Sequence, residues 1–465
     1  MKLNDVKPNI KRSGEFAEEY FDVGDKAIIM GILRQKMYSN PIKAICQEIP
    51  ANARDAHREL GNTDKPIEIK MPTNIDPMFY VRDFGVGITP DRMAEIFIKY
   101  GNSTKRSNNV QNGGWGLGAK TPFAYTDSFH VISITPEDEF VDDDGKIHKN
   151  VNVKRRYVAY IDESQIGKMA HLSTEVTKEE RGTKISLTAE KSDFSEFRRW
   201  IHSCCMYWKT LPKICGCPDF EWDIPKVELS GKDWFIEEGW SYSRNNISAL
   251  IDSIPYAINR DYLKLNYDSN EYKLLNFPIR MKFEVGEIGI TANREAIDYD
   301  KFGKTVKVIQ DKLSNIVKEL KEQMTKKIAE ADNLWDAKSL WISCSNKLEG
   351  IVDKVTWNDI EIDKSSIGVH RYGFKCYRFW INDEEVLKRK ETGSISFEKN
   401  NFLVVDDTGM RALRSSRNRV QTIFNNNQNL QYVYVVVWPD DDEDAEKCIE
   451  NLEKNHHWSD LNAAN

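Results

Sequence analysis

Apolar residues recur at helical spacing in a segment that begins at Asn40-Pro41. They stand at Ile42, Ile45, Cys46, Ile49, Ala53, Ala56 and Leu60. Asparagine is favoured at the N-cap of a helix and proline in its first turn, so the pattern predicts an amphipathic helix that starts here. A longer amphipathic helix is predicted from Lys304 to about Ala331, where apolar positions recur within Lys- and Glu-rich sequence.

Short apolar runs predict the strands. In the first half of the chain they lie at 79–82, 129–134, 157–161 and 184–187. The acidic stretch 137–144 separates two of them, and we interpret it as a solvated hairpin loop. Near the C-terminus, runs at 402–405 and 432–438 flank a helical stretch that reaches Phe424. This alternation predicts a small β-α-β unit.

The 465 residues exceed what one ordinary hydrophobic core covers, so we expect several domains. The alternating pattern changes to a helix-like, Trp-rich one near Ser192. The amphipathic helix predicted from Lys304 to about Ala331 closes the next domain. We therefore predict domains at 1–192, 193–334 and 335–465.

Composition narrows the class of protein. No apolar run approaches the roughly 18 residues that a membrane-spanning helix needs, and Met1 to Asp5 lack the apolar region of a secretory signal. We expect a cytoplasmic protein with no intrinsic membrane span. The formal charge of 66 basic minus 73 acidic residues is −7, which disfavours DNA binding except through a local basic patch.

Two groups of residues raise the question of a metal. The first group is Cys204, Cys205, Cys215 and Cys217, with His202 nearby. Because adjacent cysteines are not the usual spacing of zinc ligands, we interpret these cysteines as reduced thiols. A zinc site is the alternative. Asp406, Asp407 and Asp440 to Asp442 follow two predicted strands. We interpret them as solvated or helix-capping acids, with a metal cluster as the alternative.

The strongest chemical pattern starts on the first predicted helix. Glu48, Asn52 and Asp55 are spaced by four and three residues, so they share one stripe of that helix and can face one ligand. A carboxylate, an amide and a second carboxylate can together orient water, hold Mg²⁺ and brace the helix. Alone, the pattern is typical of a solvated surface.

Three further motifs follow in order. Asp83 ends the strand 79–82 and precedes Gly85 and Gly87, which let a backbone approach a ligand closely. The glycine-rich turn 113–120 leads into a second helical segment and presents backbone N–H groups suited to phosphates. Gly182-Thr183 then precedes the strand 184–187.

Together these motifs resemble the Bergerat ATP-binding fold of the GHKL superfamily (gyrase, heat-shock chaperone, histidine kinase, mismatch repair) over about residues 25–190. The stretch G-G-W-G-L-G-A-K-T-P-F-A-Y-T-D-S-F at 113–129 is similar to the ninety-kilodalton heat-shock chaperones. With E-I-P-A-N-A-R-D-A-H at 48–57, it resembles the rIIA family of phage rapid-lysis proteins more closely still. The resemblance implies an α+β class: a sandwich of a mixed sheet with helices on one face, a transducer-like α/β second domain and a small C-terminal α/β domain.

The resemblance also assigns roles. Glu48 is the general base that polarises the attacking water, and Asn52 binds Mg²⁺. Asp55 contacts the nucleotide indirectly or braces the helix. Asp83 accepts a hydrogen bond from the adenine amino group, with Thr183 assisting through water. Gly85 and Gly87 shape that pocket, and backbone N–H groups wrap the phosphates at Gly114, Gly116, Leu117 and Gly118.

Two basic residues complete the predicted site. Lys105 belongs to the predicted lid, where it contacts phosphate or is solvated. The segment 289–295 resembles a chaperone middle-domain segment ending in a catalytic Arg-Glu pair, so Arg294 is expected to reach the γ-phosphate. The alternative is a surface pair between Arg294 and Glu295. His57 is interpreted as a solvated or capping residue.

The function implied is an Mg²⁺-dependent ATPase whose nucleotide state drives a conformational change or ATP-dependent homodimerisation. The rIIA resemblance implies a bacteriophage factor in the host cytoplasm, at the periphery of the inner membrane, that controls lysis or protects against host exclusion, with an rIIB-type partner. Pro50 within the predicted helix favours one alternative, a non-hydrolysing ATP-gated scaffold, because proline removes a helical hydrogen bond. A second alternative is a DNA-acting topoisomerase-like or mismatch-repair-like ATPase.

Overall fold

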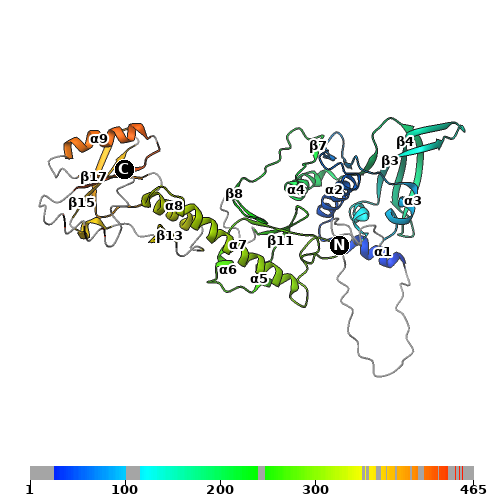
Figure 1. The fold of residues 1–465 in the computed structure, drawn as a ribbon. Coiled ribbons are helices and arrows are strands. Elements are labelled where there is room, and N and C mark those ends of the chain that lie inside the picture. Colours follow the sequence, from blue (N-terminus) through cyan, green and yellow to red (C-terminus); the bar gives the residue numbers. More distant parts are fainter. Residues whose placement is uncertain are drawn as a thin grey trace, which may run out of the picture. The chain divides into compact units, whose positions relative to one another are not determined.

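A computed structural model describes most of the chain. The described residues are 26–100, 116–238, 247–347, 351, 355–362, 368–372, 374–382, 385–397, 401–406, 413–427, 429–437, 446, 450 and 453. They divide into two compact units, one extending to residue 264 and including 275–311, the other comprising 265–274 and the chain from 312 onward. Figure 1 shows the helices and strands of each unit.

The first unit is built on a seven-stranded sheet of order β5-β4-β3-β6-β2-β1-β7. The strands are β1 (Glu68–Lys70), β2 (Met78–Arg82), β3 (Ser128–Val141), β4 (Ile147–Ile161), β5 (Gly167–Thr177), β6 (Gly182–Thr188) and β7 (Lys213–Cys215). Neighbours are antiparallel except β1 and β7, so the sheet is mixed. The predicted acidic loop lies partly in the β3–β4 hairpin strands, because β3 extends to Val141 before the chain turns.

Helix α2 (Pro41–Leu60) begins where the sequence predicts. The Asn40 side chain caps it by accepting a hydrogen bond from Lys43 N at 2.8 Å. The helix continues through Pro50 and ends at Gly61, which adopts a left-handed conformation with φ of 79°. Local capping signals therefore define both ends, and Pro50 does not terminate the helix.

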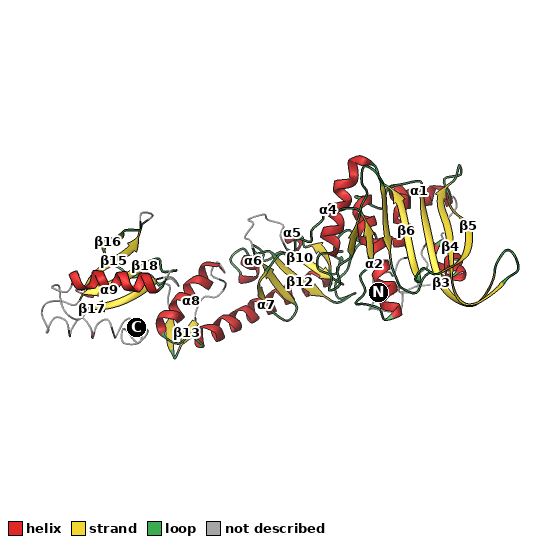
Figure 2. Ribbon diagram, turned by 90° about the horizontal axis from the view of Figure 1, so that it is seen from above, coloured by secondary structure: helices red, strands yellow, loops and turns green. Residues whose placement is uncertain are grey.

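Helices α2 and α4 (Phe194–Cys205) contribute to the core that covers one face of this sheet (Figure 2). Phe79 of β2 packs against Phe197 of α4 with ring centroids 4.7 Å apart. The predicted domain limit at 192 falls just before α4. Shorter helices of the unit are α1 (Lys26–Gln35), α3 (Pro90–Arg92), η1 (Met93–Phe97), η2 (Gly118–Ala124), η3 (Lys191–Asp193) and α5 (Arg260–Leu263).

A second, five-stranded sheet of order β11-β10-β12-β9-β8 belongs to the same unit. Its strands are β8 (Val227–Ser230), β9 (Trp234–Glu237), β10 (Ser248–Ile251), β11 (Ile254–Ala257) and β12 (Ile279–Phe283). Asp252, in the β10–β11 turn, forms ion pairs with Arg54 at 2.5 Å and Arg58 at 2.6 Å. These pairs attach the second sheet to α2.

The second unit contains a four-stranded sheet of order β16-β15-β18-β17. Its elements are α6 (Asn270–Leu274), most of α7 (Lys304–Ala329), α8 (Leu334–Lys347), β13 (Val355–Trp357), β14 (Ile360–Ile362), η4 (Val369–Tyr372), β15 (Lys375–Ile381), β16 (Leu387–Thr392), β17 (Asn401–Asp406), α9 (Leu413–Asn426) and β18 (Tyr432–Val437). Strands β17 and β18 are parallel, with α9 between them in the chain. The predicted β-α-β unit is thereby confirmed.

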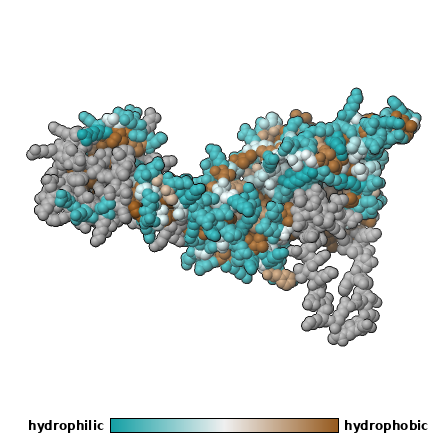
Figure 3. Space-filling view, in the orientation of Figure 1, coloured by the Kyte–Doolittle hydropathy of each residue, from teal (hydrophilic) through white to brown (hydrophobic). Residues whose placement is uncertain are grey.

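Both units mix helices with sheets, so the predicted α+β class is confirmed at that level. Hydrophilic residues predominate on the described surface in the view of Figure 3, with smaller hydrophobic patches among them. Among the described residues, no helix has the length and apolar character needed to span a membrane.

Candidate functional site

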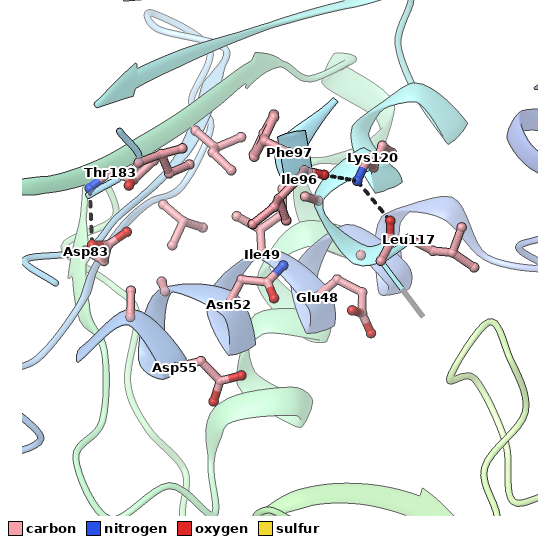
Figure 4. Close-up of a pocket in the computed structure, with 18 of the residues that line it drawn as sticks. Glu48, Ile49, Asn52, Asp55, Asp83, Ile96, Phe97, Leu117, Lys120 and Thr183 are labelled. Carbon is pink, nitrogen blue, oxygen red and sulfur yellow. Dashed lines mark hydrogen bonds between the residues drawn. The ribbon is translucent and has the colours of Figure 1, made fainter. Parts of the chain in front are cut away.

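A cavity of about 190 Å³ lies in the first unit, bordered by α2, by the ends of β2 and β6, and by η2. Figure 4 shows its lining. The predicted site residues that line it are Glu48, Asn52, Asp55, Asp83, Gly87, Gly116, Leu117, Gly118, Thr183 and Arg294. Gly85 is not part of the lining, and Lys105 and Gly114 lie outside the described residues. Residues from five separate chain segments therefore meet in one place.

The α2 motif contributes three residues from successive turns of the helix (Figure 4). Glu48 and Asp55 are almost completely buried, at 4% and 2% exposed. Buried carboxylates require hydrogen-bonding or charged partners, because desolvation disfavours their ionised form. Asp55 Oδ1 accepts a hydrogen bond from Arg58 at 3.1 Å, and Arg58 also binds Asp252. Asp55 therefore braces α2 as well as lining the cavity.

Asp83 is fixed at the end of β2 by the backbone. Its Oδ1 accepts a hydrogen bond from Gly85 N at 2.8 Å. It also accepts one from Thr183 N at 3.1 Å (Figure 4). Burial raises the pKa of Asp83 to about 6, although these hydrogen bonds counteract the rise. With Oδ1 held by the backbone, Oδ2 is the oxygen that can accept a donor from a ligand.

The glycines after Asp83 allow close packing of protein against protein. A Cβ on Gly85 would lie 2.5 Å from the Ala56 carbonyl group of α2, and one on Gly87 would lie 2.5 Å from the Ile134 carbonyl oxygen of β3. The expected reason for Gly85, space for a ligand, is wrong, because α2 fills that space. Gly118 has a related role, since a Cβ there would overlap the Glu48 carboxylate.

Lys120 belongs to the site although it was not among the predicted site residues. Its ammonium group is buried, lines the cavity, and donates to the carbonyl oxygens of Gly116 at 2.9 Å and Lys99 at 3.0 Å. Burial lowers the pKa of Lys120 to about 8. In the sequence, its position directly after the residues G-L-G-A of the glycine-rich turn is the signal that could have identified it. Lys120 therefore hydrogen-bonds to carbonyl oxygens on both sides of segment 101–115, those of Lys99 and Gly116.

Arg294 reaches the α2 motif from the segment that follows β12. Its Nη1 lies 2.8 Å from each carboxylate oxygen of Glu48, and both side chains are less than 10% exposed. Burial would lower the pKa of Arg294, but the Glu48 charge and Tyr256 outweigh it and raise the pKa above its usual value. The candidate base and the candidate phosphate sensor therefore form a buried ion pair.

Glu295 does not pair with Arg294 at the surface. Its carboxylate accepts hydrogen bonds from Asn40 N at 3.0 Å, Ser39 N at 3.1 Å and the Ser39 hydroxyl at 2.9 Å, just before α2. Gln47 Nε2 donates to the Arg294 carbonyl oxygen at 2.9 Å. The Arg294-Glu295 segment is thus bonded along the first turns of α2.

His57 is buried, not solvated as predicted, with 2% of its surface exposed. Its Nε2 accepts a hydrogen bond from Phe84 N at 2.6 Å, so Nδ1 carries the proton and donates to the Lys65 carbonyl oxygen at 3.1 Å. Burial lowers the pKa of His57, which favours this neutral form. The ring holds the loop that follows Asp83.

Asn52 fits the role of a magnesium ligand supplied with a nucleotide. It lines the cavity between Glu48 and Asp55 (Figure 4). Mg²⁺ commonly takes one or two protein oxygens and completes its shell with water and phosphate oxygens. Over the described part of the chain, no group of three or more His, Cys, Asp or Glu side chains is placed to hold a metal, and Cys204 and Cys205 are buried in α4.

Comparisons with known proteins add no family assignment. Neither the protein-family models nor the curated proteins include a match to this chain. The chemistry of the cavity and the motif resemblance are therefore what indicate a function for this chain.

Proposed function

We propose that this chain binds Mg·ATP in the cavity in the manner of a GHKL protein with a Bergerat fold, and hydrolyses it. The arrangement of Asp83 opposite the α2 motif carries the proposal. At one end of the cavity, the buried Asp83 carboxylate is held by backbone N–H groups and is suited to accept a hydrogen bond from the adenine amino group. Glu48 and Asn52 lie toward the glycine-rich turn and η2, where phosphates would be bound.

Hydrolysis requires Glu48 to act on water, and its contact with Arg294 sets a condition for this step. A carboxylate that shares its charge with a guanidinium group is a weaker base. The γ-phosphate offers Arg294 another anion, to which a planar guanidinium binds strongly. Arg294 would move toward the phosphate and release Glu48 to polarise the attacking water.

The larger biological role follows from the resemblance to the rIIA family. The second sheet, joined to α2 through Arg294, Glu295 and Asp252, would act as a transducer that responds to nucleotide. ATP binding would then drive a conformational change or homodimerisation. In an infected host cytoplasm, near the inner membrane, this switch would serve lysis control or protection from exclusion, with an rIIB-type partner.

A non-hydrolysing ATP-gated scaffold is the second candidate, and the Glu48–Arg294 pair is the observation that favours it. If Arg294 stays on Glu48 with nucleotide bound, no base is available for water. ATP would still bind through Asp83 and the glycine-rich turn.

Glu48→Gln separates the two candidates. For an ATPase, the wild type releases phosphate from Mg·ATP, and Glu48→Gln is expected to slow release by about 100-fold or more while binding ATP at least as tightly as the wild type, because no Glu48–Arg294 ion pair then competes with the γ-phosphate. Phosphate release and equilibrium ATP binding are measured on both proteins. Glu196→Gln, which changes a more exposed carboxylate that does not line the cavity, serves as the control. ATP binding without phosphate release by the wild type would favour the scaffold, and absence of binding would reject both.

Adenosine binding is expected to depend on pH through Asp83. The amino group of adenine donates a hydrogen bond, so binding requires the ionised carboxylate. With a pKa of about 6, affinity should be constant above pH 7 and fall about tenfold per unit below pH 6. Adenosine avoids the titration of nucleotide phosphates, and calorimetry at several pH values measures the effect. A flat profile between pH 5 and 7 would contradict the role of Asp83.

The raised pKa of Asp83 also makes folding stability depend on pH, in the opposite direction from ligand affinity. Because the folded-state pKa of Asp83 exceeds its unfolded value, this group favours the folded state at low pH, and that contribution disappears as pH rises through about 6. Nucleotide affinity gains from the ionisation that costs the unliganded protein stability.

A further inference from the structure

The four-stranded sheet of the second unit has two different faces. Phe379, Leu387 and Val433 pack with α9 on one of them. Side chains alternate along a strand, so their sequence neighbours face the other way. Part of that second face is covered, because Cys376, Tyr434 and Val436 on it are buried. Its more exposed part carries Arg378 and Trp380 of β15, Lys388 and Lys390 of β16, and Tyr432 of β18. We call these five residues the basic-aromatic face.

The basic-aromatic face combines cations and rings in direct contact. Lys388 lies opposite Trp380 and Lys390 opposite Arg378 in the β15–β16 ladder. The Arg378 guanidinium lies 4.6 Å from the centre of the Tyr432 ring and 5.8 Å from the Trp380 ring. Both lysines are exposed, and both rings are half-buried.

Charge on this face has one sign. At the positions of β15, β16 and β18 that lie on it, no residue is acidic, whereas the whole chain carries a formal charge of −7. Lysines on an edge strand prevent strand-to-strand association, but that role does not require an arginine held between two partly open aromatic rings. The combination instead matches an anionic ligand that also has flat surfaces.

We propose that the basic-aromatic face binds single-stranded nucleic acid. Lys388 and Lys390 contact phosphates, while Trp380, Tyr432 and the Arg378 guanidinium plane stack on unpaired bases. A duplex hides its base faces, so it could use only the cations. An acidic peptide could also use the cations but gains little from the rings. These residues belong to the second unit and none lines the nucleotide cavity, so the inference does not depend on the proposed ATPase function.

Fluorescence anisotropy with the full chain and a short labelled oligothymidylate tests the proposal. Lys388→Glu and Lys390→Glu are each expected to weaken binding about tenfold and to reduce the dependence of log affinity on log salt by about 0.7 or more. Trp380→Leu is expected to weaken binding about tenfold with little change in that salt dependence, because it removes stacking and not charge. Arg389→Glu is the matched control, since this exposed residue lies between the two lysines on the opposite face.

The controls decide between explanations. Circular dichroism of each variant verifies the fold, and a duplex of the same length and polyglutamate serve as competitors. If Arg389→Glu weakens oligonucleotide binding as much as the lysine variants do, the effect is general electrostatics and the proposal is overturned. Competition by polyglutamate combined with no effect of Trp380→Leu would assign the face to acidic protein segments. Absence of binding at low salt would reject it outright.

Discussion

Asp83→Asn is expected to lower the affinity for ATP by about ten- to a hundredfold while leaving the fold intact. Asparagine keeps an oxygen that can accept from Gly85 N and Thr183 N, so the backbone contacts of this residue survive. The other position becomes an NH₂ group, which faces the amino group of adenine as a second donor. An unsatisfied, opposed pair of donors costs about 1–3 kcal/mol, which corresponds to the stated loss.

Calorimetric titration with ATP and a thermal unfolding curve check this result. Asp91→Asn, which changes an exposed carboxylate outside the cavity, should bind ATP like the wild type. Asp83→Asn should also unfold at the same temperature or slightly higher, because it removes a buried charge. Unchanged ATP affinity would remove Asp83 from the adenine site, while a collapse of stability would show that its role is structural.

Much of the site scaffold could be predicted because its signals are local. The Asn40 cap, the apolar spacing of the helix and Gly61 identify α2 from its own residues. Helical geometry then places Glu48, Asn52 and Asp55 along one side with no knowledge of the rest of the chain. The strand that ends at Asp83 was similarly visible as an apolar run.

The features that sequence patterns missed depend on contacts between distant segments. His57 looks solvated within its helix, but Phe84 and Lys65 fold over it. The need for glycine at position 85 arises from Ala56, which periodicity cannot pair with it. Only the motif resemblance connected Arg294 with the proposed nucleotide site, and its contact with Glu48, 246 residues away in sequence, could not be read from either segment alone.

The Glu48–Arg294 pair should dominate the stability of the site. Arg294→Met leaves the Glu48 carboxylate buried without its guanidinium partner, and loss of one member of a buried pair costs about 3–5 kcal/mol. The double variant Glu48→Gln/Arg294→Met removes both charges and is expected to recover about half of that loss or more. Urea denaturation of the wild type, both single variants and the double variant measures the free energies of unfolding.

The double-mutant cycle isolates the interaction because the two residues contact each other directly. The surface pair Arg199–Glu196 provides a matched control, since its side chains are 61% and 39% exposed and its removal should cost less than about 1 kcal/mol. Additive effects of Glu48→Gln and Arg294→Met would mean that the pair contributes nothing and that Arg294 does not restrain Glu48. Strong coupling would mean that any ligand able to draw Arg294 away must supply several kcal/mol of compensating interaction. A γ-phosphate with Mg²⁺ can supply it, whereas adenosine alone cannot.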